Sequence, residues 1–156
     1  MAEGTGLIAR FYEDVIGKGQ MNLIDELTTD DLVDHEEGLP GQPAGREGVK
    51  FFVSAMREAF PDIRAKTIEP TLTDGNLEAA RAVLTGTHRG ELLGVAATER
   101  AVEIETLDII RVEDGKVAEH WRVQNDLGML KQLGVWPEGF MFRNLAVERD
   151  DPGGTR

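Results

Sequence analysis

The sequence predicts an α+β domain in which helices lie against one face of a curved sheet. Over roughly the first sixty positions, apolar residues recur at spacings of three and four, as in amphipathic helices. From Ile63 onward the spacing changes to two, which is the period of strands. A run of helices followed by a run of strands is typical of helices packed on an antiparallel sheet.

Three helices are expected before the sheet. Gly17 ends the first helix, Asn22 can cap the second, and Pro61 forbids continuation of the third. The expected elements are helices over 7–16, 23–27 and 49–60, a short segment at 32–35 and a turn-rich loop at 38–45.

Four strands, expected to be antiparallel, and one further helix complete the domain. Asn125 or Asp126 can cap this last helix, which carries Leu127, Leu130 and Leu133 on one side and ends at Gly134. The expected strands cover 63–73, 77–88, 101–112 and 117–124.

The C-terminal residues divide into an aromatic arm and a charged tail. The arm, residues 135–142, exposes large apolar groups unless it docks, either on its own domain or on a second copy, and packing within the domain is the first expectation. The tail, 149–156, is charged and Gly-rich, so we expect it to be disordered. Residues 1–148 then form a single domain.

Composition excludes several classes of partner. A formal net charge of −12 opposes binding to nucleic acid, because most of that affinity comes from Lys and Arg at phosphates. No apolar run approaches the ~20 residues that span a membrane, and the first residues lack the pattern of a signal peptide. The chain has no Cys, which agrees with the reducing cytoplasm, where we expect it to reside.

The central strand carries one carboxylate on an otherwise apolar face. Alternate residues from Val102 to Val112 are apolar except for Thr106 and Asp108, so Asp108 is expected to point into the core. An inward Asp either performs chemistry as a general acid or base, or belongs to a buried ion pair.

The register of the following hairpin decides which residues join Asp108. A two-residue turn would pair Val112 with Val117 and place Asp108 opposite Trp121. A three-residue loop, 113–115, would pair Val112 with Lys116 and Asp108 with His120, with Arg122 as the diagonal neighbour. The sequence Glu-Asp-Gly favours the second register, because Asp suits the end of a type I turn and Gly the left-handed position after it.

Each candidate also has a structural interpretation. Arg122 either binds a substrate carboxylate or enolate, or neutralises Asp108. Histidine as a residue type suits proton transfer near neutral pH, which makes His88 and His120 candidates, and either can instead be a structural hydrogen-bonded His. The predicted catalytic residues are Asp108, Arg122, His120 and His88. The predicted substrate-binding residues are His35, Tyr12, Trp121, Phe52 and Met56, although packing also explains Tyr12 and Trp121, and a solvated acidic loop explains His35. No short metal-ligand spacing is present, so neither a metal nor another cofactor is expected.

Several motifs, in order and at compatible spacing, resemble those of the SnoaL-like polyketide cyclases over roughly residues 7 to 137. They are Gly48-Val-Lys-Phe-Phe52, Phe60-Pro-Asp62, Gly86-Thr-His-Arg-Gly-Glu-Leu-Leu-Gly94, Glu113-Asp-Gly-Lys116, Glu119-His-Trp121 and Leu130-Lys-Gln-Leu-Gly134. The resemblance implies the fold of ketosteroid isomerase, scytalone dehydratase and limonene epoxide hydrolase: a cone-shaped barrel of strongly curved sheet, with three N-terminal helices over a central pocket and a short C-terminal helix. It also implies cofactor-free acid/base chemistry, which in the cyclases closes a ring by an intramolecular aldol step.

Two positions depart from the family pattern. The cyclases have His at the position of Asp108 and their catalytic Asp at the position of Arg122. An Asp beside an Arg is more similar to the arrangement in limonene epoxide hydrolase. The other site residues of that enzyme have no counterpart in this sequence.

Three functions follow as hypotheses. The first is a cyclase or isomerase acting on an apolar oxygenated small molecule, with Asp108 moving the proton. The second is hydrolysis of an epoxide, and the third is a non-catalytic binding or scaffold protein. The mixed charged and apolar residues on the other face of strand 101–112 also predict a homodimer.

Overall fold

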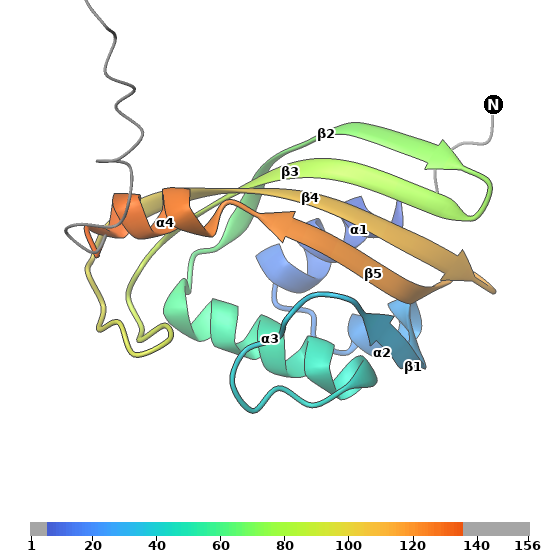
Figure 1. Cartoon of the computed structure of the whole chain (residues 1–156), viewed down its shortest axis with the longest axis horizontal. Helices are drawn as coiled ribbons and strands as arrows, with labels where there is room; N and C mark the ends of the chain where they lie inside the picture. The colour runs from blue at the N-terminus through green and yellow to red at the C-terminus, as the bar shows by residue number, and fades with distance from the viewer. Residues whose placement is uncertain (1–5, 136–156) are drawn as a thin grey trace, which may run out of the picture.

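The structure, a computed structural model, describes residues 6–135. Helices cover one face of an open sheet, and the other face is uncovered by the described residues (Figure 1). None of the described helices is long and apolar enough to cross a membrane. The elements are α1 (Leu7–Arg10), η1 (Phe11–Gly17), α2 (Leu23–Leu27), β1 (Thr28–Asp34), α3 (Gly45–Ala59), β2 (Arg64–Asp74), β3 (Leu77–Thr87), β4 (Ala101–Glu113), β5 (Lys116–Gln124) and α4 (Asp126–Leu133).

The sheet has five strands in the order β1-β5-β4-β3-β2. The expectation of four strands was therefore wrong, because the segment around Leu32 forms β1 and pairs in parallel with β5. Three of its seven residues are charged and exposed, and only two are buried, so its own pattern does not distinguish it from a loop. The expected barrel was also wrong, since β1 and β2 lie at opposite edges and do not pair.

The alternation predicted for the central strand is confirmed. Val102, Ile104, Thr106, Asp108 and Ile110 are buried on the side of the sheet that faces the helices. Apolar residues of η1 and α3 pack over this inner face, and the resulting core includes Val15, Ile16, Val53 and Met56. The inner face therefore combines the core with one buried carboxylate.

The first predicted helix is present but changes form along its length. After one α-helical turn it becomes a π-helix over Phe11–Gly17. π-Helical turns are rare and often occur at functional sites. Here the π-helix carries Tyr12, whose side chain is buried against the sheet.

The β4–β5 hairpin follows neither register in full. Its turn is the two-residue type that the sequence analysis disfavoured: Asp114 and Gly115 both have positive φ, and Val112 pairs with Val117. Both central residues of a type I′ turn require such angles, and Asp-Gly is among its preferred sequences. Two residues later the register shifts, which leaves Ala118 as an extra residue in β5.

This β-bulge restores the predicted grouping on the inner face. Asp108 pairs directly with Arg122, whereas His120 pairs with Ile110 and is the diagonal neighbour of Asp108. The predicted pairing of Asp108 with His120 was therefore wrong by two residues. Because side chains alternate, the three titratable side chains still share one face.

The helix ends agree only in part with their predicted caps. Asn125 caps α4 by accepting a hydrogen bond from the Gly128 amide, and Gly134 ends the helix in a left-handed conformation. Asn22 occupies the cap position of α2, but its side chain makes no capping bond. Leu127 is exposed, because α4 buries Met129 and Leu133 instead. The aromatic arm beyond Val135 and the charged tail lie outside the described residues.

The connection between β1 and α3 lies very close to the first turn of α3. A Cβ atom added at Gly48 would lie 2.1 Å from the carbonyl oxygen of Pro43, which is backbone and cannot swing away. Gly48 therefore allows the connection to fold back over the helix. This connection also contributes to the cavity described below.

We predict that Gly48→Ala destabilises the domain. Ala normally stabilises a helix by about 1 kcal/mol relative to Gly, but a buried clash of this kind lowers the free energy of unfolding by roughly 1–3 kcal/mol. Urea denaturation measures the difference. Ser54→Ala, at an exposed position of the same helix, is the control and should change the value by less than about 0.5 kcal/mol. Equal stability of the two variants would contradict the close approach.

Candidate active site

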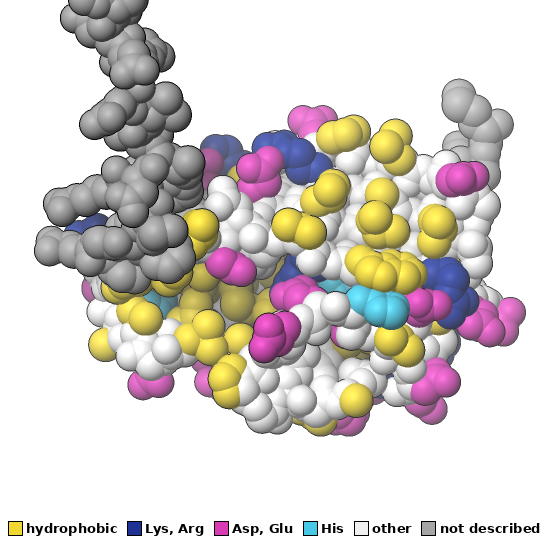
Figure 2. Space-filling view, viewed as in Figure 1, with side chains coloured by type: hydrophobic (Ala, Val, Ile, Leu, Met, Phe, Trp, Pro, Cys, Tyr) yellow, Lys and Arg dark blue, Asp and Glu magenta, His cyan; other side chains and the backbone are white. Residues whose placement is uncertain are grey.

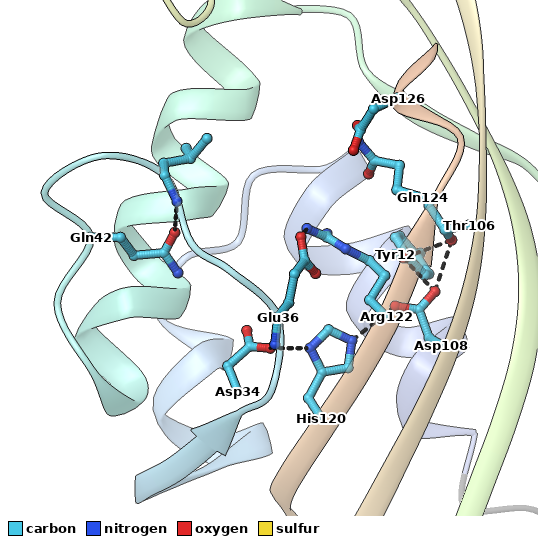
Figure 3. Close-up of polar contacts among 11 residues, drawn as sticks. Tyr12, Asp34, Glu36, Gln42, Thr106, Asp108, His120, Arg122, Gln124 and Asp126 are labelled. Atoms are coloured by element: carbon cyan, nitrogen blue, oxygen red, sulfur yellow. Dashed lines mark hydrogen bonds and ion pairs between the residues drawn. The ribbon is translucent and has the colours of Figure 1, made fainter. Parts of the chain in front are cut away.

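A cavity of about 110 Å³ lies between the inner face of the sheet and the helices. Most of its lining is apolar and comes from α1, η1, α3 and the inner face of β3 and β4. Polar side chains are grouped on the part formed by β1, β4, β5 and the connection after β1 (Figure 3). The main members of this polar group are Tyr12, Asp34, Glu36, Asp108, His120 and Arg122.

Asp108 is the centre of the polar group. Its side chain lies on the inner face of β4 and the residue is only 3 % exposed. One carboxylate oxygen, Oδ2, accepts hydrogen bonds from the Tyr12 hydroxyl at 2.7 Å and from the Thr106 hydroxyl at 2.8 Å. The other oxygen, Oδ1, lies 2.9 Å from Nε2 of His120. A buried carboxylate requires such partners, because burial without them is very unfavourable.

His120 connects Asp108 to a second carboxylate. Its Nδ1 atom lies 3.3 Å from Oδ1 of Asp34, because β1 runs parallel to β5 and places Asp34 beside it. Burial lowers the pKa of His120, but the hydrogen bonds and charges of Asp108 and Asp34 outweigh this effect and raise the pKa to about 9. The ring is therefore an imidazolium at neutral pH, with a carboxylate at each nitrogen.

Tyr12 remains a proton donor in this environment. Burial and the negative charge of Asp108 raise the pKa of its hydroxyl far above the ordinary value. The hydroxyl also lies 3.1 Å from the Thr106 hydroxyl. Tyr12 and Thr106 together fix the orientation of the Asp108 carboxylate.

Arg122 lies beside this group with a different partner from the one expected. Its guanidinium donates to the Glu36 carboxylate and lies over the Phe52 ring, with Cζ 4.3 Å from the ring centroid. Its backbone pairs with Asp108, but the two side chains form no ion pair within 4.0 Å. The two side chains are therefore not in direct contact, although the charge of Asp108 is one of the causes that raise the pKa of Arg122.

The structure brings six of the nine predicted site residues to the cavity: Asp108, Arg122, His120, Tyr12, Phe52 and Met56. The other three do not line it. His88 is fully buried against Phe60, with Nδ1 bound to Thr98. His35 and Trp121 stack on each other with ring centroids 4.6 Å apart, and His35 also contacts Glu119.

Asp34, Glu36 and Thr106 are site residues that the sequence does not predict. Asp34 and Glu36 belong to a run of acidic residues that resembles a solvated loop, and their proximity to β5 depends on a parallel pairing between distant segments. Thr106 was visible as a polar residue within an inward alternation. Within the described residues, no group of three or more His, Asp or Glu side chains is arranged to hold a metal ion.

We predict that Asp34→Asn lowers the pKa of His120. The raised pKa of His120 stabilises the folded state. This contribution to the free energy of unfolding is fully present below about pH 6.5 and is lost as the pH rises through about 9. Removing one of the two carboxylates should move the folded-state pKa toward its ordinary value. An NMR titration of the imidazole signal, assigned by its loss in His120→Gln, measures the shift.

The matched control is Asp31→Asn, because Asp31 is an exposed carboxylate on the same strand. It should leave the midpoint of the His120 titration unchanged. If Asp34→Asn also leaves the midpoint unchanged, then the contact between Asp34 and His120 does not control the protonation of the ring.

Comparison with known proteins agrees with this architecture. The family model described as SnoaL-like polyketide cyclase matches residues 6–133. The aklanonic acid methyl ester cyclase DnrD of Streptomyces peucetius is 41% identical over 106 residues, which are 67% of this chain and 70% of that protein. The nogalonic acid methyl ester cyclase of Streptomyces nogalater is 29% identical over 122 residues, covering 77% of this chain and 90% of that protein.

Solved structures give the same result. The crystal structure of wild-type IdmH from Streptomyces antibioticus superposes with a TM-score of 0.70 at 36% identity, covering 83% of this chain and 96% of that one. TsrD from Streptomyces laurentii superposes with a TM-score of 0.75 at 25% identity, covering 83% and 93%. The family model spans most of the chain and includes every residue of the polar group, so the chain belongs to the SnoaL-like polyketide cyclase family.

Proposed function

We propose that this protein is a cofactor-independent polyketide cyclase that closes a ring by intramolecular aldol addition. The observation that carries the proposal is the contact between the Asp108 carboxylate and the His120 imidazolium at the wall of an apolar cavity. A carboxylate that can act as a base and an imidazolium that can act as an acid, in contact with each other, are the groups that such a reaction requires.

The reaction then proceeds without net gain or loss of protons. Asp108 removes a proton from a carbon next to a substrate carbonyl, which breaks the C–H bond and forms an enolate. The enolate carbon attacks a second carbonyl carbon of the same molecule, and the new C–C bond closes the ring. His120 protonates the oxygen of the attacked carbonyl. A proton passing from Asp108 to His120 across their 2.9 Å contact restores both groups.

The neighbouring hydroxyls act as positioning residues for Asp108. Tyr12 and Thr106 both donate hydrogen bonds to Oδ2. These bonds fix the orientation of the carboxylate that removes the proton from the substrate carbon. Asp34 holds the other side of the imidazole ring. The acid and the base are thus both held in place before the substrate binds.

The relatives and the lining of the cavity both support one class of substrate. The curated relatives are named as cyclases of aklanonic and nogalonic acid methyl esters. An apolar cavity with a few polar groups fits the methyl ester of a similar polyketide acid. We propose such esters as the substrates, with aklanonic acid methyl ester as the first to test.

Epoxide hydrolysis and passive binding are the two alternatives. In hydrolysis, Asp108 would activate water while Arg122 orients it, but the side chain of Arg122 contacts Glu36 rather than Asp108. Labelled solvent oxygen would enter the product of hydrolysis and not the product of ring closure. A passive binding protein would bind the ester without converting it.

We predict that Asp108→Asn reduces the rate of ring closure by about a hundred- to ten-thousandfold, because the variant lacks the general base. The measurement is conversion of aklanonic acid methyl ester to its cyclised isomer, followed by chromatography and mass spectrometry. Asp31→Asn is the control and should retain the wild-type rate. Full activity of Asp108→Asn would overturn the assignment of the base, and no conversion by the wild-type protein would overturn the proposed substrate.

We also propose that the protein is a homodimer formed through the outer face of the sheet, which we define as the face away from the helices. Figure 2 shows hydrophobic side chains gathered over the strands on this face. Nearby charges are already paired, as in Arg81 with Glu105 and Arg111 with Glu119. A second copy would cover the exposed apolar residues Val33, Leu72, Leu107, Ile109 and Val123.

We predict that Val123→Asp converts the dimer to a monomer. Val123 is 73 % exposed on β5 and pairs with Leu107, so a carboxylate there would be buried without a partner in the proposed interface. Size-exclusion chromatography with light scattering measures the mass. Leu93→Asp, at an exposed leucine outside the sheet, should leave the mass unchanged. A monomeric wild-type protein would exclude the proposed dimer.

A further inference from the structure

The ion pair between Arg122 and Glu36 leaves polar atoms of both residues without partners. Arg122 donates through Nη2 to Oε1 of Glu36. Nε of Arg122 and Oε2 of Glu36 are buried and have no hydrogen-bond partner. A guanidinium has five N–H donors, and burying unsatisfied donors is unfavourable. Two charged groups at the cavity are therefore in contact with each other but incompletely satisfied.

The two partners are held very differently. Arg122 lies on β5 between two pairing strands, and the Phe52 ring supports the plane of its guanidinium. Glu36 lies just after β1 in the connection of residues 35–44, which contains neither helix nor strand. A ligand can therefore displace Glu36 by moving a loop, whereas displacing Arg122 would disrupt the sheet.

The size of the cavity indicates that something must move when a substrate binds. Its volume is about 110 Å³, well below the roughly 300 Å³ at the lower end of small-molecule sites. Glu36, Gly38, Leu39 and Gln42 of the connection all line it (Figure 3 labels Glu36 and Gln42). Moving Glu36 outward would thus enlarge the cavity at the place where it uncovers Arg122.

The charges around Arg122 indicate what would replace Glu36. Asp108 and Asp34 both contact His120, so Glu36 is the carboxylate that pairs with Arg122 among the described residues. An anionic oxygen on the ligand would replace the counter-charge that Glu36 provides and satisfy the free donor of the guanidinium. A neutral ligand would leave Arg122 without a counter-charge.

We propose that Arg122 is an oxyanion-binding subsite for a carboxylate or enolate oxygen of the ligand, and that Glu36 occupies this subsite in the ligand-free protein. The inference rests on the proposed function only in taking the cavity as the substrate site. During ring closure an enolate oxygen develops negative charge, and a fixed guanidinium is suited to stabilise it. The ligand oxygen takes the place of Glu36, and the connection opens as it enters.

The test measures binding of two matched probes, 2-naphthoate and neutral 2-naphthylmethanol, by calorimetry at pH 7. Removing the competing carboxylate in Glu36→Ala should strengthen naphthoate binding about tenfold or more relative to naphthylmethanol, since charge-assisted hydrogen bonds are the stronger class. The quantity compared is the ratio of the affinities for the two probes, because enlarging the cavity would change both affinities alike. Glu36→Gln, which removes the charge and keeps the shape, should shift the ratio in the same direction, and the thermal unfolding of both variants reports that they are folded.

Two further variants make the proposal falsifiable. Glu37→Ala removes an adjacent, exposed negative charge and should leave the probe ratio within about twofold, because exposed charges are screened. Adding Arg122→Met to Glu36→Ala should abolish the gain. If Glu37→Ala gives an equal gain, or if the gain survives without Arg122, the subsite is wrong. Naphthoate binding requires no turnover, so failure of the proposed cyclase reaction would be seen separately in the Asp108→Asn assay.

Discussion

The burial of one carboxylate determines the arrangement of the site. Asp108 lies where helices and sheet meet, and its three hydrogen bonds come from η1, from its own strand β4 and from β5. The donors from η1 and β4 share one carboxylate oxygen and His120 contacts the other, so η1 must approach the sheet closely and His120 must face inward. The requirement to satisfy this buried charge thus links the packing of the N-terminal helix to the register of the last hairpin.

The sequence was sufficient for the elements whose signals are local. The alternation around Asp108, the break at Pro61 and the cap at Asn125 each depend on neighbouring residues, and the structure has all three features. The hairpin register was only half predictable. Asp-Gly identifies the turn, but the bulge at Ala118 has no distinctive residue, and it changes which strand positions are opposite each other.

Features that depend on distant segments could not be predicted. β1 is a charged edge strand whose pairing with β5 spans most of the chain, and without it Asp34 has no relation to His120. The same holds for Glu36 and Arg122. The sequence placed Arg122 beside Asp108 in space, but the choice between a direct ion pair and a competing acidic partner depends on the path of a loop.

The extra residue at Ala118 also couples the two faces of β5. Side chains alternate along the strand, with His120 and Arg122 inward and Trp121 and Val123 outward. Deleting one residue there would exchange the sets, burying an indole in the cavity and exposing the imidazole to solvent. The length of this hairpin is consequently constrained during evolution. An insertion or deletion of a single residue between residues 113 and 119 would need a second, compensating change that restores the alternation of the strand.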